Sequence, residues 1–254
     1  MLRGLYMAGG ALIEQSLNLE VTSNNIANVN TIGFKADRTR FQPFQEVLLG
    51  RTNDNKATGH IGGLMRGSGS IQGGYVDYAQ GPLTETGNPL DVGIDGPGFI
   101  TVQWNENEVA YTRCGEFTLD DSNQLITGEG QMVLNEHGSP ITVPPGGAVA
   151  IDRGGQILVD SVPVGRLQLM VAGDPYQLEK VGENLFRDKG EAGMASAESS
   201  SRLRQGFLER SNVSALDAIT DLTVILRSFE ASQKMITMMD ETLKQAVADL
   251  GRTQ

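Results

Sequence analysis

Residues 214–250 read SALDAITDLTVILRSFEASQKMITMMDETLKQAVADL, and the spacing of their apolar side chains decides the fold at this end of the chain. Apolar residues recur at intervals of seven: Ala215, Leu222, Phe229, Ile236, Leu243 and Leu250. A second row comprises Ile219, Leu226 and Val247, with Gln233 and Asp240 interrupting it. Seven-residue spacing is typical of a helix with one apolar stripe. Ser214 and Asp217 place a hydrogen-bond acceptor and a negative charge at its start. We therefore predict one long helix from about residue 214 to 250.

The N-terminal segment carries the same spacing. Its seven-residue row is Leu5, Leu12, Leu19 and Ile26. Four asparagines crowd the end of this row and Gly33 follows, and both residue types tolerate the left-handed conformation that closes a helix. We predict a second helix over residues 2–28 that ends before Gly33.

Heptad spacing at both ends of one chain predicts that the two helices pair as a coiled coil once the middle has folded. Periodicity alone equally favours two amphipathic helices packed on the middle domain. Apolar residues off the main stripe favour pairing with further neighbours, because a helix that is apolar on more than one face needs more than one partner. These residues are Ile13, Leu17, Val21, Leu216, Val224, Ile225, Met235, Met238 and Met239. Open head-to-tail polymerisation supplies such neighbours. We expect an assembly interface made of Leu5, Leu12, Leu19, Ile26, Leu222, Phe229, Ile236 and Leu243.

The middle of the chain differs from both ends. Most of the 32 glycines lie there, which indicates many tight turns. Short alternating or apolar segments separated by turn residues predict an antiparallel β domain. These segments are Leu90–Ile94, Phe99–Trp104, Val109–Thr112, Phe117–Leu119, Gln124–Thr127, Met132–Leu134, Ala148–Ile151, Gln156–Val159 and Leu167–Val171. Residues 173–213 are expected to be irregular, with a second linker at 192–201.

The predicted fold class is therefore α+β, with an antiparallel all-β middle domain flanked by N- and C-terminal helices. We expect residues 1–49 to form one half of a terminal-helix domain and residues 201–254 the other half. Residues 50–74 are rich in Gly, Ser, Asn and Thr and are expected to be a linker or loop. Residues 75–200 form the β-rich domain in this scheme.

Composition excludes several classes of protein. The net charge of −11 argues against nucleic-acid binding, which depends on Lys and Arg displacing counterions. Cys114 is the only cysteine, so the chain has no internal disulfide. We expect no cleaved signal peptide at the N-terminus and no membrane-spanning segment.

The residues that could carry chemistry are better explained by turns. Gly96-Pro-Gly98 lacks the third glycine and the following helix of a phosphate-binding loop. Asp91, Asp95, Asp120 and Asp121 invite comparison with a glycosidase pair, but the sequence around Asp120 is that of a hairpin loop. His60 and His137 have no second ligand at metal-binding spacing. We predict no catalytic, cofactor or metal site, and no enzyme activity.

One segment is far more specific than periodicity. Residues 23–35 read SNNIANVNTIGFK, which resembles the N-terminal signature of the bacterial flagellar rod and hook family, an Ala-Asn-Asn-Leu-Ala-Asn core followed by Thr-x-Gly-Phe-Lys/Arg. Ser23 and Ile26 depart conservatively from it. The matching positions are Asn24, Asn25, Ala27, Asn28, Thr31, Gly33, Phe34 and Lys35. Further matches lie at residues 80–92, 96–99, 111–117, 124–127 and 206–213. Residues 78–83, 164–167, 182–186 and 250–252 look more like the proximal rod members than the distal ones.

The resemblance implies a structural subunit of the flagellar basal-body rod that polymerises helically with itself or other rod proteins and transmits torque. It implies export by the flagellar type III apparatus to a rod that spans the periplasm, without a cleaved signal peptide. Phe44 to Leu48 is similar to the short element that exported subunits present to the export gate. The alternatives are a secreted β-domain adhesin with oligomerising ends and, more distantly, a carbohydrate-active enzyme.

Overall fold

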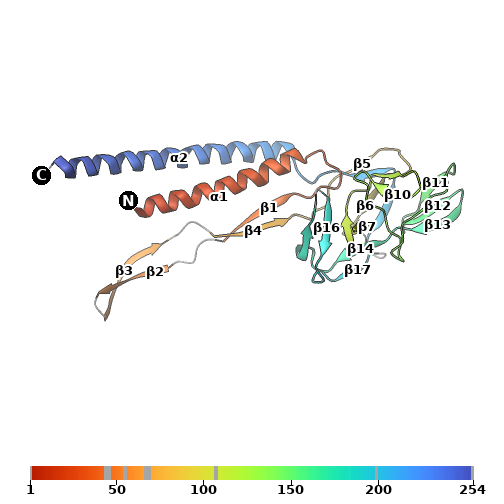
Figure 1. Ribbon diagram of the computed structural model, residues 1–254, viewed down its shortest axis with the longest axis horizontal. Helices are drawn as coiled ribbons and strands as arrows, with labels where there is room; N and C mark the ends of the chain where they lie inside the picture. Colours follow the sequence, from red (N-terminus) through yellow and green to blue (C-terminus); the bar gives the residue numbers. More distant parts are fainter. Residues whose placement is uncertain are drawn as a thin grey trace. The chain divides into compact units, whose positions relative to one another are not determined.

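The structure, a computed structural model, describes residues 2–42, 47–53, 56–65, 70–105, 108–182, 184–197 and 200–252 (Figure 1). Two α-helices enclose the strands in chain order. The elements are α1 (Leu2–Ala27), β1 (Asp37–Gln42), β2 (Val47–Asn53), β3 (Lys56–Met65), β4 (Ser70–Val76), β5 (Leu83–Glu85), β6 (Val92–Asp95), β7 (Gly98–Asn105), β8 (Glu108–Thr112), β9 (Phe117–Leu119), β10 (Leu125–Thr127), β11 (Val149–Ile151), β12 (Gln156–Val159), β13 (Val162–Arg166), β14 (Leu169–Ala172), the 3₁₀-helix η1 (Pro175–Gln177), β15 (Leu178–Lys180), β16 (Leu185–Asp188), β17 (Met194–Ser196), β18 (Arg202–Gln205), β19 (Phe207–Glu209) and α2 (Ala215–Arg252).

The chain divides into two compact units. Unit 1 comprises Met1–Ile26, Asp37–Tyr75 and Ala215–Gln254, and unit 2 comprises Ala27–Ala36 and Val76–Ser214. Unit 1 therefore holds α1 and α2, and unit 2 holds β5 to β19. The antiparallel β region between two terminal helices confirms the predicted α+β class.

In unit 1 the two helices run antiparallel beside each other (Figure 1). The Gln15 side-chain amide donates a hydrogen bond of 2.7 Å to the Ser228 hydroxyl, and this contact places the two residues at the same position along the helix axes. The Asn25 side chain donates to the Asp37 carbonyl at 2.8 Å and accepts from the Asp37 amide at 2.9 Å. Because that amide group satisfies both backbone groups of Asp37, it fixes the start of β1 against the end of α1.

The Gly-rich stretch 50–74 differs from the expected linker. Its residues contribute to β2, β3 and β4, with β2 paired to β3 and β1 paired to β4. Strands of this composition are hard to recognise in a sequence, because glycine and polar residues give no apolar alternation and the backbone hydrogen bonds alone define the ladder.

Unit 2 is built around a six-stranded antiparallel sheet with the order β15-β16-β8-β7-β14-β17. Successive residues of β7 face opposite sides of it. Ile100 and Val102 enter the main core with Val92, whereas Phe99 packs in a second cluster with Phe186. Both faces are covered, which explains why β7 is apolar at consecutive positions.

The β region differs from the prediction in three segments. Residues Met132–Leu134 make isolated bridges rather than a strand. The expected irregular region 173–213 instead supplies β15 to β19, of which β17 lies in the expected second linker. These strands are three or four residues long, too short for a periodic signal, and they form because longer neighbours offer them backbone partners. β18 pairs with β6 and β19 with β5, so unit 2 extends to Ser214.

Candidate functional site

A half-buried row follows α2 from Leu222 to Leu243. Its residues are spaced by alternating steps of three and four: Leu222, Ile225, Phe229, Ser232, Ile236, Met239 and Leu243. Alternation of this kind defines the contact seam of a heptad repeat. The four C-terminal positions of the predicted assembly interface, Leu222, Phe229, Ile236 and Leu243, all lie in this row.

The second row of the heptad differs from the prediction. Ile219, Leu226 and Val247, which were expected at the alternate core position, are 53%, 42% and 69% exposed. The alternate positions are Ile225, Ser232 and Met239. Residues three and four positions from the main row lie on opposite sides of it, and periodicity cannot choose between them. Ser228, which accepts the hydrogen bond from Gln15 of α1, lies on the same side of the main row as Ile225 and Ser232.

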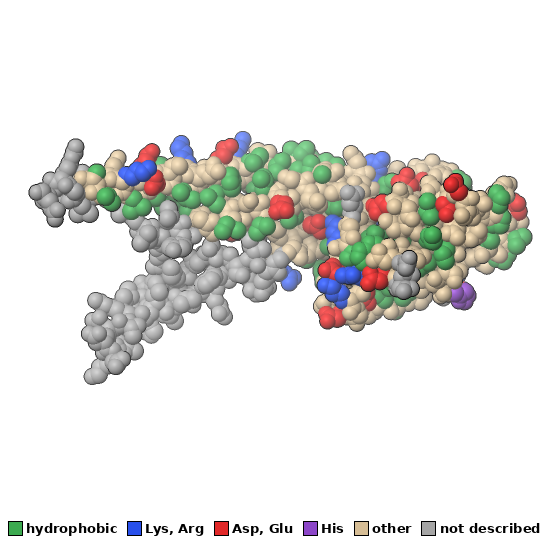
Figure 2. All heavy atoms as spheres, viewed as in Figure 1, with side chains coloured by type: hydrophobic (Ala, Val, Ile, Leu, Met, Phe, Trp, Pro, Cys, Tyr) green, Lys and Arg blue, Asp and Glu red, His purple; other side chains and the backbone are tan. Residues whose placement is uncertain are grey.

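Apolar side chains on other faces of α2 are exposed in the described part of the chain. Leu216, Val224, Met235 and Met238 are between 48% and 76% exposed. Figure 2 shows hydrophobic side chains recurring along this helix. Val224 and Met238 lie two positions beyond members of the main row, about 200° around the helix. The helix therefore presents a second apolar surface away from its seam.

The N-terminal part of the predicted interface lies in α1. Leu12, Leu19 and Ile26 are half-buried, and the side chain of Leu5 lies outside the described residues. Ile13 is 63% exposed and belongs to an otherwise polar exposed face that includes Glu20. Among the side chains that the structure describes in the two helices, the exposed apolar ones therefore lie mainly on α2.

The signature segment ends in a buried charge cluster that was not predicted from the sequence. The Lys35 Nζ atom lies 2.7 Å from Oε1 of Glu209, and Nη1 of Arg113 lies 3.2 Å from Oε2. The Glu209 carboxylate also accepts from the Gly81 amide at 2.8 Å, and Lys35 donates to the Ala79 carbonyl at 2.8 Å. Three donors, from Lys35, Arg113 and Gly81, thus surround one carboxylate that has no exposed surface.

Burial governs the electrostatics of this cluster. Burial lowers the pKa of the Lys35 ammonium. The Glu209 carboxylate opposes this shift, and the positive charge of Arg113 adds to it. A buried charge without a partner is strongly destabilising. The three side chains therefore act as a unit, and their role in the structure is to hold residues 33–35 against β19.

The other signature residues have local roles. Gly33 has a φ of +71°, and its amide donates to the Glu209 carbonyl at 2.8 Å. Phe34 is 1% exposed, with Lys180 Nζ 4.3 Å from its ring centroid. The Thr31 hydroxyl donates to the Asn28 side chain at 3.1 Å. Asn24 and Ala27 are exposed. The predicted export element lies elsewhere: Phe44 and the side chain of Leu48 are outside the described residues.

Of the carboxylates considered for catalysis, Asp95 ends β6 and forms an ion pair with Arg204, whereas Asp91 and Asp120 accept hydrogen bonds within or beside turns. Asp91 accepts from the Thr86 hydroxyl at 2.6 Å and from the Asn88 amide at 2.9 Å. Asp120 accepts from backbone amides of its own hairpin loop. Among the described residues, no group of three or more His, Cys, Asp or Glu side chains is placed to hold a metal ion. Within the same part of the chain, neither helix is long and apolar enough to cross a membrane.

Three family models match the chain. Residues 5–35 match the model described as "Flagella basal body rod protein", residues 93–159 match "Flagellar hook protein FlgE/F/G D1 domain", and residues 204–249 match "Flagellar basal body rod FlgEFG protein C-terminal". The first range contains α1 with the signature segment, and the last contains most of α2.

Individual relatives match over nearly the whole chain. The flagellar basal-body rod protein FlgG of Bacillus subtilis is 34% identical over 97% of this chain and 98% of its own length. FlgG of Caulobacter vibrioides is 34% identical, over 96% of this chain and 97% of its own length. FlgF of the same organism is 34% identical over 92% of each. Proteins of both names are thus similar to this chain at equal identity.

Proposed function

Because the chain belongs to the flagellar basal-body rod protein family, we propose that it is a structural subunit of the rod that polymerises helically through its two terminal helices. Its role is mechanical: the assembled subunits form a stiff shaft that transmits torque. No enzyme activity is part of this role. The comparisons give no support to the adhesin alternative.

The observation that carries this proposal is the apolar surface of α2 outside its seam. Val224 and Met238 are 61% and 54% exposed in the isolated chain. Burial of one such side chain is worth about 1.5–3 kcal/mol, and several along one helix stabilise a tight contact. Neighbouring subunits of a helical assembly supply the surfaces that bury them.

The seam of α2 has a different role in the proposal. We place the half-buried row of α2 against Leu5, Leu12, Leu19 and Ile26 of α1 in a coiled coil. The hydrogen bond of Gln15 to Ser228 defines the register of the antiparallel helices. Leu19, four residues after Gln15, then lies opposite Val224, and so between Leu222 and Ile225 along the helix axis. Each subunit then contributes a two-helix block, and the surfaces outside the seam join one block to the next.

The family assignment also supports a proposal for the location and the partners of the subunit. We propose that the subunit resides in the basal body, in the rod that spans the periplasm, and that its neighbours are further copies or other rod proteins. Export by the flagellar type III apparatus without a cleaved signal peptide belongs to the same proposal. The choice of the proximal over the distal type stays a prediction.

The test is the location of an epitope-tagged chain in purified basal bodies, with a deletion strain assayed for swimming and for filaments. We expect the tagged chain in the rod fraction and loss of filaments on deletion. A chain missing from basal bodies, in a deletion strain that still swims, would overturn the proposal.

A further inference from the structure

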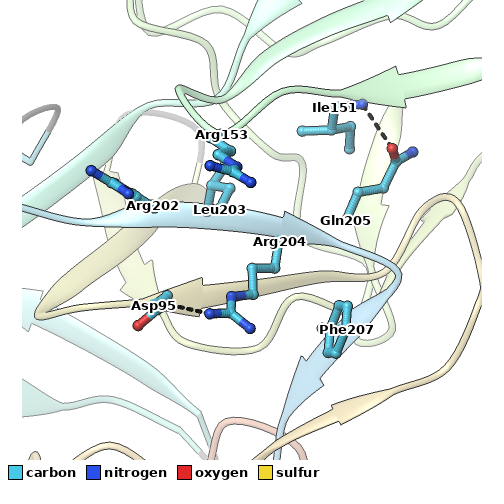
Figure 3. Close-up of a pocket in the computed structure, with 8 residues that line it drawn as sticks. All are labelled: Asp95, Ile151, Arg153, Arg202, Leu203, Arg204, Gln205 and Phe207. Atoms are coloured by element: carbon cyan, nitrogen blue, oxygen red, sulfur yellow. Dashed lines mark hydrogen bonds and ion pairs between the residues drawn. The ribbon is translucent and has the colours of Figure 1, made fainter.

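A cleft lined by three arginines opens in unit 2, beside the edge where β18 pairs with β6 (Figure 3). We call it the arginine cleft and define it by Arg153, Arg202 and Arg204, with Asp95 and Leu203. Its cavity volume is about 540 Å³. The chain has an excess of acidic residues, with 31 Asp and Glu against 20 Lys and Arg, so three arginines around one cleft form a local reversal of charge.

The fold holds this cleft in place through the backbone. β18 alternates, with Leu203 1% exposed and the flanking Arg202 and Arg204 directed outward. The Leu203 amide donates to the Arg153 carbonyl at 3.1 Å, which ties the turn after β11 to β18. The Gln205 side chain accepts from the Ile151 amide at 3.2 Å and fixes the same turn from its other side, as the dashed line in Figure 3 marks.

The three guanidinium groups are not equivalent. Arg204 forms an ion pair of 2.9 Å with Asp95, and its position toward Asp95 is visible in Figure 3. Arg153 and Arg202 are exposed and make no ion pair with any residue in the described part of the chain. Two guanidinium groups on a fixed backbone are therefore available to carboxylates, which they bind in bidentate geometry.

We propose that the arginine cleft binds a carboxylate-bearing surface segment of a second copy of this chain. The proposal rests on the polymerisation put forward above and names a contact between the β-rich units. Charge complementarity favours this occupant, because copies that each carry a net charge of −11 repel one another unless opposite charges meet at the contact.

The sign of the cleft also fixes the type of contact. A basic cleft cannot pair with itself across a two-fold axis, because like charges directly opposite one another repel. It needs a different, acidic surface of the neighbour, and such heterologous contacts generate open helical assemblies wherever the rotation between neighbours does not close into a ring. A contact of this kind specifies the relative orientation of neighbouring subunits. Apolar helix surfaces alone do not specify it, because apolar contacts are non-directional.

The test uses two charge-reversed variants in a strain that lacks the native chain. Arg153→Glu combined with Arg202→Glu removes the basic cleft. Lys189→Glu combined with Arg210→Glu makes the same change in net charge at exposed sites outside it. We expect the amount of the cleft variant in basal bodies to fall on the order of tenfold and that of the control variant to stay near the unsubstituted level. Urea unfolding midpoints of both purified variants equal to that of the unsubstituted chain show that folding is intact.

The occupant is identified by photo-crosslinking in basal bodies from Arg202→p-benzoylphenylalanine, followed by mass spectrometry of the adduct. We expect an adduct to an acidic segment of the same chain. Adducts only to glycan, to lipid or to a different protein would overturn the proposal, and so would normal incorporation of the cleft variant. If the unsubstituted chain itself is absent from basal bodies, the rod function fails, an outcome that these readouts separate from failure of the cleft alone.

Discussion

The Lys35 ammonium lies 2.7 Å from the Glu209 carboxylate, and neither side chain has any exposed surface. The two residues are 174 positions apart. Lys35 lies near the end of the first segment of unit 2, Ala27–Ala36, and Glu209 near the end of the second, Val76–Ser214, so their ion pair joins the two segments. Arg113 joins the same carboxylate and stacks over the Phe99 ring at 5.1 Å, which links the charge cluster to the aromatic side of the sheet.

The first prediction concerns Glu209→Gln. The substitution keeps the shape but leaves Lys35 and Arg113 as buried cations without a counter-charge. We expect the free energy of unfolding to fall by about 3–5 kcal/mol, as for other broken buried ion pairs. Urea unfolding of the purified chain measures it. Glu85→Gln, at an exposed position of β5, is the control and should change stability by less than about 0.5 kcal/mol. A small effect at Glu209 would mean that water reaches the cluster.

This cluster marks the limit of prediction from the sequence. Lys35, Arg113 and Glu209 each lie in a segment that resembles the family, but nothing in those segments indicates that the three side chains meet. Their pairing depends on which strands meet, and β19 is only three residues long. Pairing of such short strands is decided by the tertiary structure, because their own sequences carry too few residues for a periodic pattern.

The helices were predictable because they are long enough to carry a repeated apolar pattern. The C-terminal heptads repeat often enough to define α2 within two residues at either end. Even there, the sequence could not choose between the rows through Ile225 and through Leu226, since both lie next to the main row at helical spacing. The arginine cleft was missed because β18 reads Arg-Leu-Arg-Gln, in which a single buried leucine gives no visible alternation.

The second prediction compares two glycines. Gly33 and Gly87 have almost the same φ, +71° and +72°, but a Cβ at Gly33 would lie 2.6 Å from backbone atoms of Arg113 and Cys114, whereas Gly87 has open space. Gly87→Ala should therefore cost about 1 kcal/mol, the conformational term alone. Gly33→Ala adds a clash with backbone and should cost at least about 3 kcal/mol. Equal urea midpoints for the two variants would contradict the close packing at Gly33.

The third prediction concerns the Cys114 thiol. Burial, reinforced by the charges of Glu116, Glu129 and Asp91, raises its pKa from 9.0 to about 11. At pH 8 the thiolate fraction is then about 100-fold lower than for an unperturbed thiol, and iodoacetamide labelling should be slower by a similar factor. Labelling in urea is the control and should restore the normal rate. The folded state holds the proton more tightly, so this group's contribution to stability should decline as pH rises from about 9 to 11. Equal rates with and without urea would refute the shift.

The fourth prediction tests the pairing of α1 with α2. In a Cys114→Ser background, Gln15→Cys with Ser228→Cys replaces the two hydrogen-bonded side chains, and a short bismaleimide should join them within one chain. Ser16→Cys with Ser228→Cys is the matched control, because Ser16 lies about 100° further around α1 on its exposed face. We expect efficient linkage of the first pair in purified basal bodies and little of the second, read from the shift in gel mobility. Equal yields would mean that α1 and α2 do not keep this register in the assembled rod.

The last prediction separates the assembly surface of α2 from its seam. Val224→Glu with Met238→Glu places charges on the exposed apolar surface, and Thr223→Glu with Thr237→Glu places them one position earlier, on exposed polar residues. Neither pair lies in the half-buried row, so urea unfolding of the isolated chain should be unchanged for both. Loss of two apolar contacts of about 1.5–3 kcal/mol each should lower incorporation into basal bodies at least about 100-fold for the first variant. The threonine variant should support swimming. Normal swimming with Val224→Glu and Met238→Glu would mean that this surface faces solvent in the rod, and that the subunits join through other faces of unit 1.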